Sequence, residues 1–218
     1  MTTYELQNRF NLEMEKYNIF EPIMSVIVQD YINYAYQQYI TEKYDSLINP
    51  VEKFEVTERI SRILAPLLFD FTSTTFVAVT TNSPYGYYTL GPTDLQYLIK
   101  ESAVVHTVDC DNVATTAIVK IVPMKHKMIS SNTNNPFLKP DDTEIWRVNN
   151  SGNKIELILA SYQTLHSYTC RYIKKHLTVN LVTSVTMEVD DSVHEEIVVK
   201  AAYLYLGSIN KTKNKENV

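Results

Sequence analysis

The stretch EKFEVTERISRILAPLLFDFTSTTFVAVTT, residues 52–81, contains the point at which the hydrophobic periodicity of the chain changes. In its first part the apolar residues recur at helical spacing, and this pattern stops near Pro66, which a helix interior does not tolerate. The apolar positions of that part are Phe54, Ile60, Ile63 and Leu64. From about residue 70 the pattern alternates, as it does in a half-buried strand. The stretch therefore predicts a helical part over residues 1–67 and a β-rich part after it, which is the α+β class.

Two further helical patterns lie before this stretch. The first covers residues 3–17, with Leu6, Phe10, Met14 and Tyr17 at helical spacing, and ends at a break between Asn18 and Pro22. The second runs from Pro22 to residue 48, long enough for about six turns. Together with the pattern at 52–68, they predict an N-terminal helical bundle part.

Residues 68–189 predict a mainly antiparallel β module. Strand patterns occur at 69–81, 115–127 and 167–175, and residues 82–88 predict a turn followed by a second strand. Residues 91–110 predict a short helix that runs into another strand. The segments 144–150 and 154–162 are joined by Asn-Ser-Gly-Asn, which favours a hairpin. Pro136 and Pro140 predict a loop over 131–142, with neither helix nor strand.

The segment DDSVHEEIVVKAAYLYLGSI, residues 190–209, predicts a C-terminal docking helix followed by a polar tail at 210–218. We expect Ser192 to be the N-cap and Glu195 to complete a capping box. A zinc hydrolase helix would require a second imidazole one turn after His194, and Val198 stands there instead. His194 is therefore predicted to decorate the first turn of an ordinary helix.

Composition narrows the function classes. The chain has 218 residues, of which 44% are hydrophobic, so one large or two small domains can form a core. A formal net charge of -5 disfavours a nucleic-acid-binding face, and the four glycines form no phosphate-binding loop. The N-terminal segment has no signal-peptide pattern, and no apolar run approaches a membrane span, so we expect a soluble protein that is intracellular when made.

Two His-x-x-x-Cys pairs, His106 with Cys110 and His166 with Cys170, could together supply the four ligands of a tetrahedral zinc site. On a strand, positions four apart share a face, so we expect the two members of each pair to lie on one face. Neither pair has a second nearby cysteine, so satisfied buried side chains are the favoured interpretation. Cys170 beside Arg171 is a conceivable nucleophile, but no residue is nominated as its base. We therefore expect no catalytic, cofactor-binding or metal-binding residue, with a hydrolase that uses Cys170 or His166 as the alternative.

Protein contacts are the favoured role for several aromatic residues. The chain contains 16 tyrosines, and tyrosine combines a large apolar area with a polar tip. Trp146 and Arg147 lie where the proline-containing loop becomes a strand, which suits either a binding arm or a residue that closes the core edge. The predicted interface residues are Phe137, Trp146, Arg147, Tyr31, Tyr36 and Tyr39.

Several segments together resemble one family, in the same order along the chain. They are ELQNRFNLEMEKYN, YINYAYQQYITEKY, FEVTERISRI, NNPFLKP, EIWRV, CRYIKK and VHEEIVVKAA. This set is similar to the neck ring proteins of crAss-like bacteriophages. The resemblance implies a non-enzymatic virion protein, assembled in the host cytoplasm, that forms a dodecameric ring between portal and tail. Its implied partners are the portal protein and other neck and tail proteins, while genome DNA passes through the channel without sequence-specific binding, and no membrane is involved. The alternative without a ring is a stand-alone adaptor.

Overall fold

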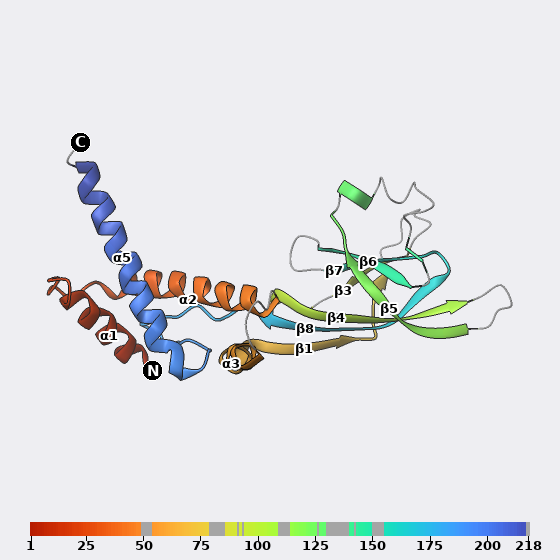
Figure 1. Cartoon of the computed structure of the whole chain (residues 1–218), viewed down its shortest axis with the longest axis horizontal. Helices are drawn as coiled ribbons and strands as arrows, with labels where there is room; N and C mark the ends of the chain where they lie inside the picture. The colour runs from red at the N-terminus through yellow and green to blue at the C-terminus, as the bar shows by residue number, and fades with distance from the viewer. Residues whose placement is uncertain are drawn as a thin grey trace. The chain divides into compact units, whose positions relative to one another are not determined.

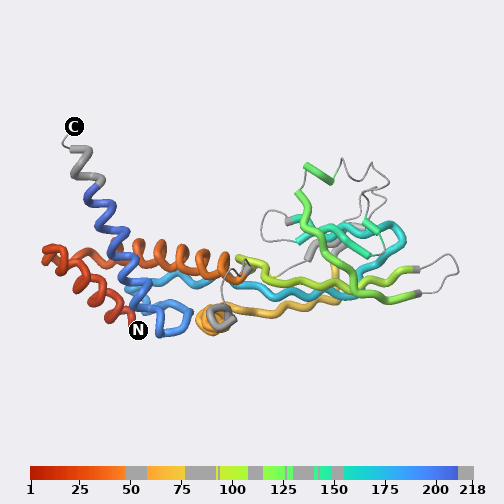
Figure 2. Tube along the Cα trace, viewed as in Figure 1, coloured from red at the N-terminus to blue at the C-terminus, as the bar shows by residue number. Residues whose placement is uncertain are grey.

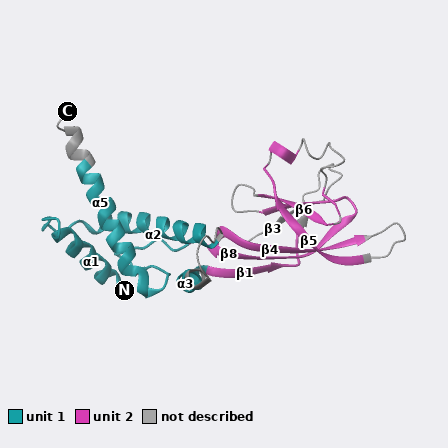
Figure 3. Cartoon of the chain, in the orientation of Figure 1, with its two compact units in different colours: residues 1–67, 176–218 teal, residues 68–175 magenta. Residues whose placement is uncertain are grey.

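The protein is described by a computed structural model over residues 1–48, 54–78, 86–90, 92, 94–108, 114–125, 127–129, 140–141, 143–149 and 155–216. The chain divides into two compact units (Figure 3). Residues 1–67 and 176–218 form the helical unit, and residues 68–175 form the sheet unit. The predicted α+β class is confirmed. Among the described helices, none combines the length and apolar character that crossing a membrane requires.

The helical unit contains α1 (Thr3–Glu15), α2 (Ser25–Ile48), α3 (Phe54–Leu64) and α5 (His194–Glu216), with short 3-10 turns at Ala65–Leu67 and Asp191–Val193 (Figure 1). Helices α1 and α2 both pack against α5. The apolar stripe of each helix forms the shared core, because burial of these side chains is the main driving force for packing the helices together. Fully buried members include Leu6, Phe10, Val28, Ile32, Ala35, Ile197, Val198 and Ala201.

A side-chain cap defines the start of α1, and a left-handed backbone turn defines its end. Thr2 is the N-cap: its hydroxyl accepts from the backbone N–H of Glu5 (3.3 Å), and the Glu5 carboxylate accepts from the N–H of Thr2 (2.7 Å). After the helix, Asn18 has a φ of 62°, a left-handed conformation that asparagine tolerates better than most residues. The chain therefore turns at Asn18, and the N–H of Ile19 closes the turn on the carbonyl of Met14 (3.2 Å).

The C-terminal helix is present, but both predicted ends are wrong. The capping side chain is Asp190, not Ser192: its carboxylate accepts from the N–H of Ser192 (2.9 Å), and a 3-10 turn precedes the helix. The helix continues to Glu216 rather than 209, with Gly207 inside it. No proline follows Gly207 to stop the helix.

Segment 176–189 groups with the helices rather than with the β module to which the sequence assigned it. Side chains of α2 supply hydrogen bonds that an irregular segment cannot make within itself. Asn33 accepts from the N–H of Val179 (2.7 Å) and donates to its carbonyl (3.0 Å). Gln29 accepts from the N–H of Leu181 (3.1 Å).

The sheet unit contains β1 (Leu68–Ser73), β2 (Val77–Ala78), β3 (Gly86–Leu90), β4 (Leu95–Val108), β5 (Ala114–Pro123), β6 (Glu144–Asn149), β7 (Ile155–Leu159) and β8 (Gln163–Lys174). Their order is β1-β8-β4-β5-β6-β7-β3-β2. Every described pair is antiparallel except β5 with β6, so the predicted mainly antiparallel arrangement is confirmed. Figure 2 shows strand β1 and the long strands β8 and β4 running side by side.

Residues 91–110 do not contain the predicted short helix in their described part. Strand β4 starts at Leu95 and pairs with β8 from Leu95 opposite Lys174 to Thr107 opposite Gln163. This long pairing overrides the local helical pattern, because the partner strand satisfies the backbone groups of β4 along almost its whole length. The segment 69–81 similarly gives two strands, β1 and β2, instead of one.

The hairpin of β6 and β7 is confirmed, with Trp146 opposite Ile158. Of the predicted loop 131–142, only residues 140 and 141 are among those described. Inward-facing residues of the strands build the core of the sheet unit, with members such as Ala103, Val105, Ile145, Leu157, Leu165 and Tyr168.

Candidate functional site

The helical unit exposes several large apolar side chains. Among its described residues they are Tyr4, Leu12, Tyr17, Phe20, Met24, Val26, Tyr34, Leu177, Val182 and Tyr203. Tyr4 and Leu12 lie two turns apart on α1 with Asn8 between them, on the face opposite the buried residues Leu6 and Phe10. Exposed apolar residues that gather on one face are a mark of interaction surfaces.

The turn after α1 extends this face. Because Asn18 reverses the chain, the following residues return alongside the outer face of α1 and leave the Phe20 ring 72% exposed. A hollow with a volume of about 320 Å³ lies here, lined by Asn8, Asn11, Leu12, Glu15, Ile19, Phe20, Glu21 and Pro22. We call the surface formed by Tyr4, Asn8, Leu12 and Phe20, together with this hollow, the elbow surface.

The chemistry of the elbow surface suits protein contact rather than catalysis. Its charged lining residues are the carboxylates Glu15 and Glu21, and the remainder are asparagines, aromatic rings and aliphatic side chains. Large rings supply area at low conformational cost, and amides supply adaptable hydrogen bonds. The sequence did contain a signal for this surface, because Tyr4 and Leu12 are large apolar residues off the apolar stripe of the first helix, and Phe20 is a large apolar residue in the break after it.

The structure places the predicted interface tyrosines mainly in the core. The side chains of Tyr36 and Tyr39 are almost fully buried, and burial raises the pKa of each phenol to about 12. The Tyr36 hydroxyl also accepts from the backbone N–H of Glu188 (3.1 Å). Tyr31 is half-buried and donates to the Ser208 hydroxyl (2.8 Å). Of the three predicted interface tyrosines, Tyr31 is therefore the one whose side chain stays partly exposed to solvent.

Trp146 and Arg147 lie on β6 and make contacts within the sheet unit. Trp146 is only 3% exposed and packs in a cluster with Val148 and Ile158. Arg147 donates through Nε to the Glu101 carboxylate (2.8 Å), and Tyr168 donates to the same carboxylate (3.2 Å). Burial raises the pKa of Glu101 despite these partners. Phe137 lies outside the described residues.

Cys170 and His166 do not form a nucleophile and base pair. The side chain of Cys170 is buried, and burial raises its pKa to about 11, so the reactive thiolate is disfavoured near neutral pH. His166 is exposed on the other face of β8. The expectation that the two share a face is wrong, because the register of β8 against β4 shifts between Val104 and Val105 and breaks the alternation.

The two histidines, by contrast, are brought together. His106 Nε2 on β4 lies 2.8 Å from His166 Nδ1 on β8. Cys110, the remaining residue of the predicted zinc set, lies outside the described residues. Within the ranges that the structure describes, no group of three or more His, Cys, Asp or Glu side chains is arranged to hold a metal.

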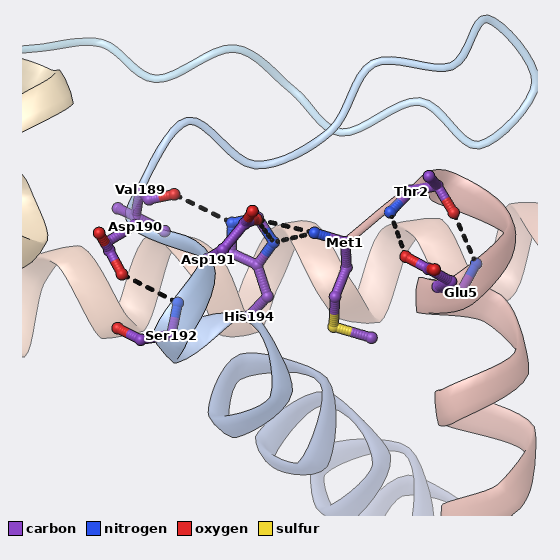
Figure 4. Close-up of polar contacts among 8 residues, drawn as sticks. All are labelled: Met1, Thr2, Glu5, Val189, Asp190, Asp191, Ser192 and His194. Atoms are coloured by element: carbon purple, nitrogen blue, oxygen red, sulfur yellow. Dashed lines mark hydrogen bonds and ion pairs between the residues drawn. The ribbon is translucent and has the colours of Figure 1, made fainter.

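His194 is buried rather than a decoration of the first turn, with only 2% of its surface exposed. Its Nε2 lies 3.0 Å from the Val189 carbonyl, and its Nδ1 lies 3.0 Å from Asp191 and 3.1 Å from the Met1 amino group (Figure 4). Burial lowers the pKa of His194, so the neutral ring is favoured. The arrangement joins the start of α1 to the start of α5, which is a structural role.

Comparison with known proteins supports a role of this chain in a protein assembly. A protein-family model described as phage tail ring protein 3/4 matches residues 1–217. The search of curated proteins gives no match. Since the family model covers nearly the whole chain, both units belong to the matched region. The chain is thus a member of the crAss-like phage tail ring protein 3/4 family, whose members are structural proteins of the virion.

Proposed function

We propose that this protein forms a closed ring in the phage neck, between portal and tail, and extends the conduit through which DNA passes. The observation that carries the proposal is the family match over residues 1–217. A ring protein requires contacts between subunits, and the neck position follows from the resemblance of several segments to neck ring proteins. The same resemblance gives twelve as the expected number of copies, with the portal and other neck and tail proteins as neighbours.

The elbow surface is our candidate for one of the two faces through which neighbouring copies meet. In a closed ring each subunit presents two different faces, so one face of each copy must bind a different face of the next. Exposed Tyr4 and Phe20 supply aromatic anchors of the kind that dominate interface energies, and exposed Leu12 adds apolar area beside them. Phe137 and Tyr31 stay candidate contact residues of the same assembly.

The net charge of -5 supports a role in conducting DNA without holding it. A channel wall rich in lysine and arginine would bind phosphates and slow passage, because phosphate contacts dominate affinity for DNA. A structural role, rather than a hydrolase, is supported by the protonated and buried Cys170 thiol.

An assembly assay tests the proposal. Purified chain is mixed with portal protein, and the masses of the products are measured over a range of concentrations. We expect a discrete high-mass complex, and we expect the variant Tyr4→Ala/Phe20→Ala to stay monomeric while it folds normally. Tyr34→Ala is the matched control, because Tyr34 is exposed on α2. A wild-type chain that never exceeds a dimer, with or without portal, would favour the adaptor alternative.

A further inference from the structure

We propose that His106 and His166 form a binding site for one divalent transition-metal ion of the zinc, nickel or copper class on the exposed face of the sheet unit. Imidazole nitrogens are preferred ligands of these ions. The proposal is independent of ring formation and differs from the zinc site considered from the sequence, because it uses no cysteine.

The backbone brings the two rings together. His106 lies on β4 opposite Thr116 of β5 on one side and Thr164 of β8 on the other. The register shift beside Val104 and Val105 leaves His166 without a direct partner among the residues paired between β4 and β8. Bulges commonly change the direction in which a side chain points, and this irregularity directs the His166 side chain towards His106.

The geometry of the pair suits a shared ion. The distance between His106 Nε2 and His166 Nδ1 is 2.8 Å, and the ring centroids lie 4.3 Å apart at an interplanar angle of 61°. Two nitrogens that bind one ion at about 2.1 Å, at an angle near 90–110°, stand about 3.0–3.4 Å apart. The rings therefore need to separate by only a few tenths of an ångström, which small side-chain rotations provide.

Thr116 orients the first ligand. Its hydroxyl lies 2.8 Å from Nδ1 of His106. When the hydroxyl accepts the Nδ1 proton, the lone pair of His106 is on Nε2 and faces His166. Ligating histidines are commonly held this way by an oxygen on their other nitrogen.

The second ligand must change tautomer. With the Nδ1 proton of His106 directed at Thr116, the hydrogen bond between the two rings requires the N–H at Nδ1 of His166 to donate to Nε2 of His106. On binding, that proton moves to Nε2 of His166, so that the lone pairs of His106 Nε2 and His166 Nδ1 both point at the ion. The pair loses no proton overall. The direct cross-strand partners of His106, Thr116 and Thr164, are uncharged and do not repel a cation. Because His166 is exposed, water can fill the remaining coordination positions.

Titration of the metal-free full-length chain with Ni²⁺, Zn²⁺ and Cu²⁺ tests the site, using calorimetry and the electron paramagnetic resonance of bound Cu²⁺. We expect one ion per chain and a Cu²⁺ spectrum with coupling to two nitrogens. His106→Gln and His166→Gln should each weaken binding at least about tenfold. Loss of a residue that only hydrogen-bonds to a metal ligand already weakens metal binding about 10–100-fold, and loss of the ligand itself should cost at least as much. Thr116→Val should weaken binding less, through lost orientation.

His176→Gln is the matched control, because it removes an imidazole from the helical unit. Circular dichroism checks that each variant is folded, and the asparagine variant at the same position, His106→Asn or His166→Asn, replaces a glutamine variant that is not. Equal affinity in wild type and both variants would show an adventitious ion only and overturn the proposal. Loss of binding in just one of the two variants would also overturn it, because one histidine would then bind alone.

Discussion

Replacing Trp146 with alanine tests whether its indole packs in the core of the chain or makes a contact with another chain. In the single chain the indole is 3% exposed and packs against Val148 and Ile158 in the hairpin of β6 and β7. A cavity of this kind typically costs about 3–5 kcal/mol. The free energy of unfolding of a typical domain is only about 5–15 kcal/mol, so the loss is a large fraction of the total.

For a chain of this length, about 1 kcal/mol lowers the melting temperature by about 2–4 °C, so we expect a decrease of about 6–20 °C. Thermal unfolding of the purified, unassembled chain, followed by circular dichroism, measures this. Phe20→Ala is the control, because a 72% exposed ring has little packing to lose, and we expect its stability to change by less than about 0.5 kcal/mol. Unchanged melting of Trp146→Ala, combined with failure to assemble, would refute the core assignment and show that the indole makes its contact between chains.

Three other changes test the description of the subunit. Arg147→Met alone should cost about 3–5 kcal/mol because it leaves the largely buried Glu101 carboxylate without its cationic partner, although Tyr168 still donates to it. Arg147→Met/Glu101→Gln should recover most of that loss in a double-mutant thermal cycle. Asp190→Ala should cost about 1 kcal/mol through the lost cap, while Ser192→Ala should change stability by less than about 0.5 kcal/mol; the reverse ranking in denaturant titration would contradict the observed cap. Because burial lowers the folded-state pKa of His194 from 6.5, the unfolded state binds more protons as the pH falls through 6.5, so stability should decrease on acidification. His194→Gln should flatten that slope, and an unchanged slope would argue against the buried neutral ring.

The parts of the fold that depend on local pattern were predictable from the sequence. The helical spacing of Leu6, Phe10 and Met14 identified α1, and the change at about residue 70 located the start of the sheet. Pairing over long sequence distances was not predictable in this way. Strand β4 is a strand throughout because it lies against β8, and the segment 176–189 joins the helices because Asn33 and Gln29 bind its backbone.

The same distinction applies to the candidate sites. Aromatic content drew attention to tyrosine and tryptophan, but composition does not distinguish a buried ring such as Tyr36 from an exposed one such as Tyr4. The spacing of His166 and Cys170 suggested one shared face, and a register shift that has no local sequence signal places them on opposite faces. That shift also brings His166 to His106, 60 residues away in the sequence.

Electron cryo-microscopy of purified phage particles, with a label fused to the C-terminus of this chain, is the most direct test of the proposed neck ring. We expect the label to mark a single closed ring of twelve copies between portal and tail, with the DNA path through its centre. The elbow surface of each copy should then lie against the next copy. Absence of the label from the particle, or its presence as isolated copies that do not close a ring, would contradict the proposed function.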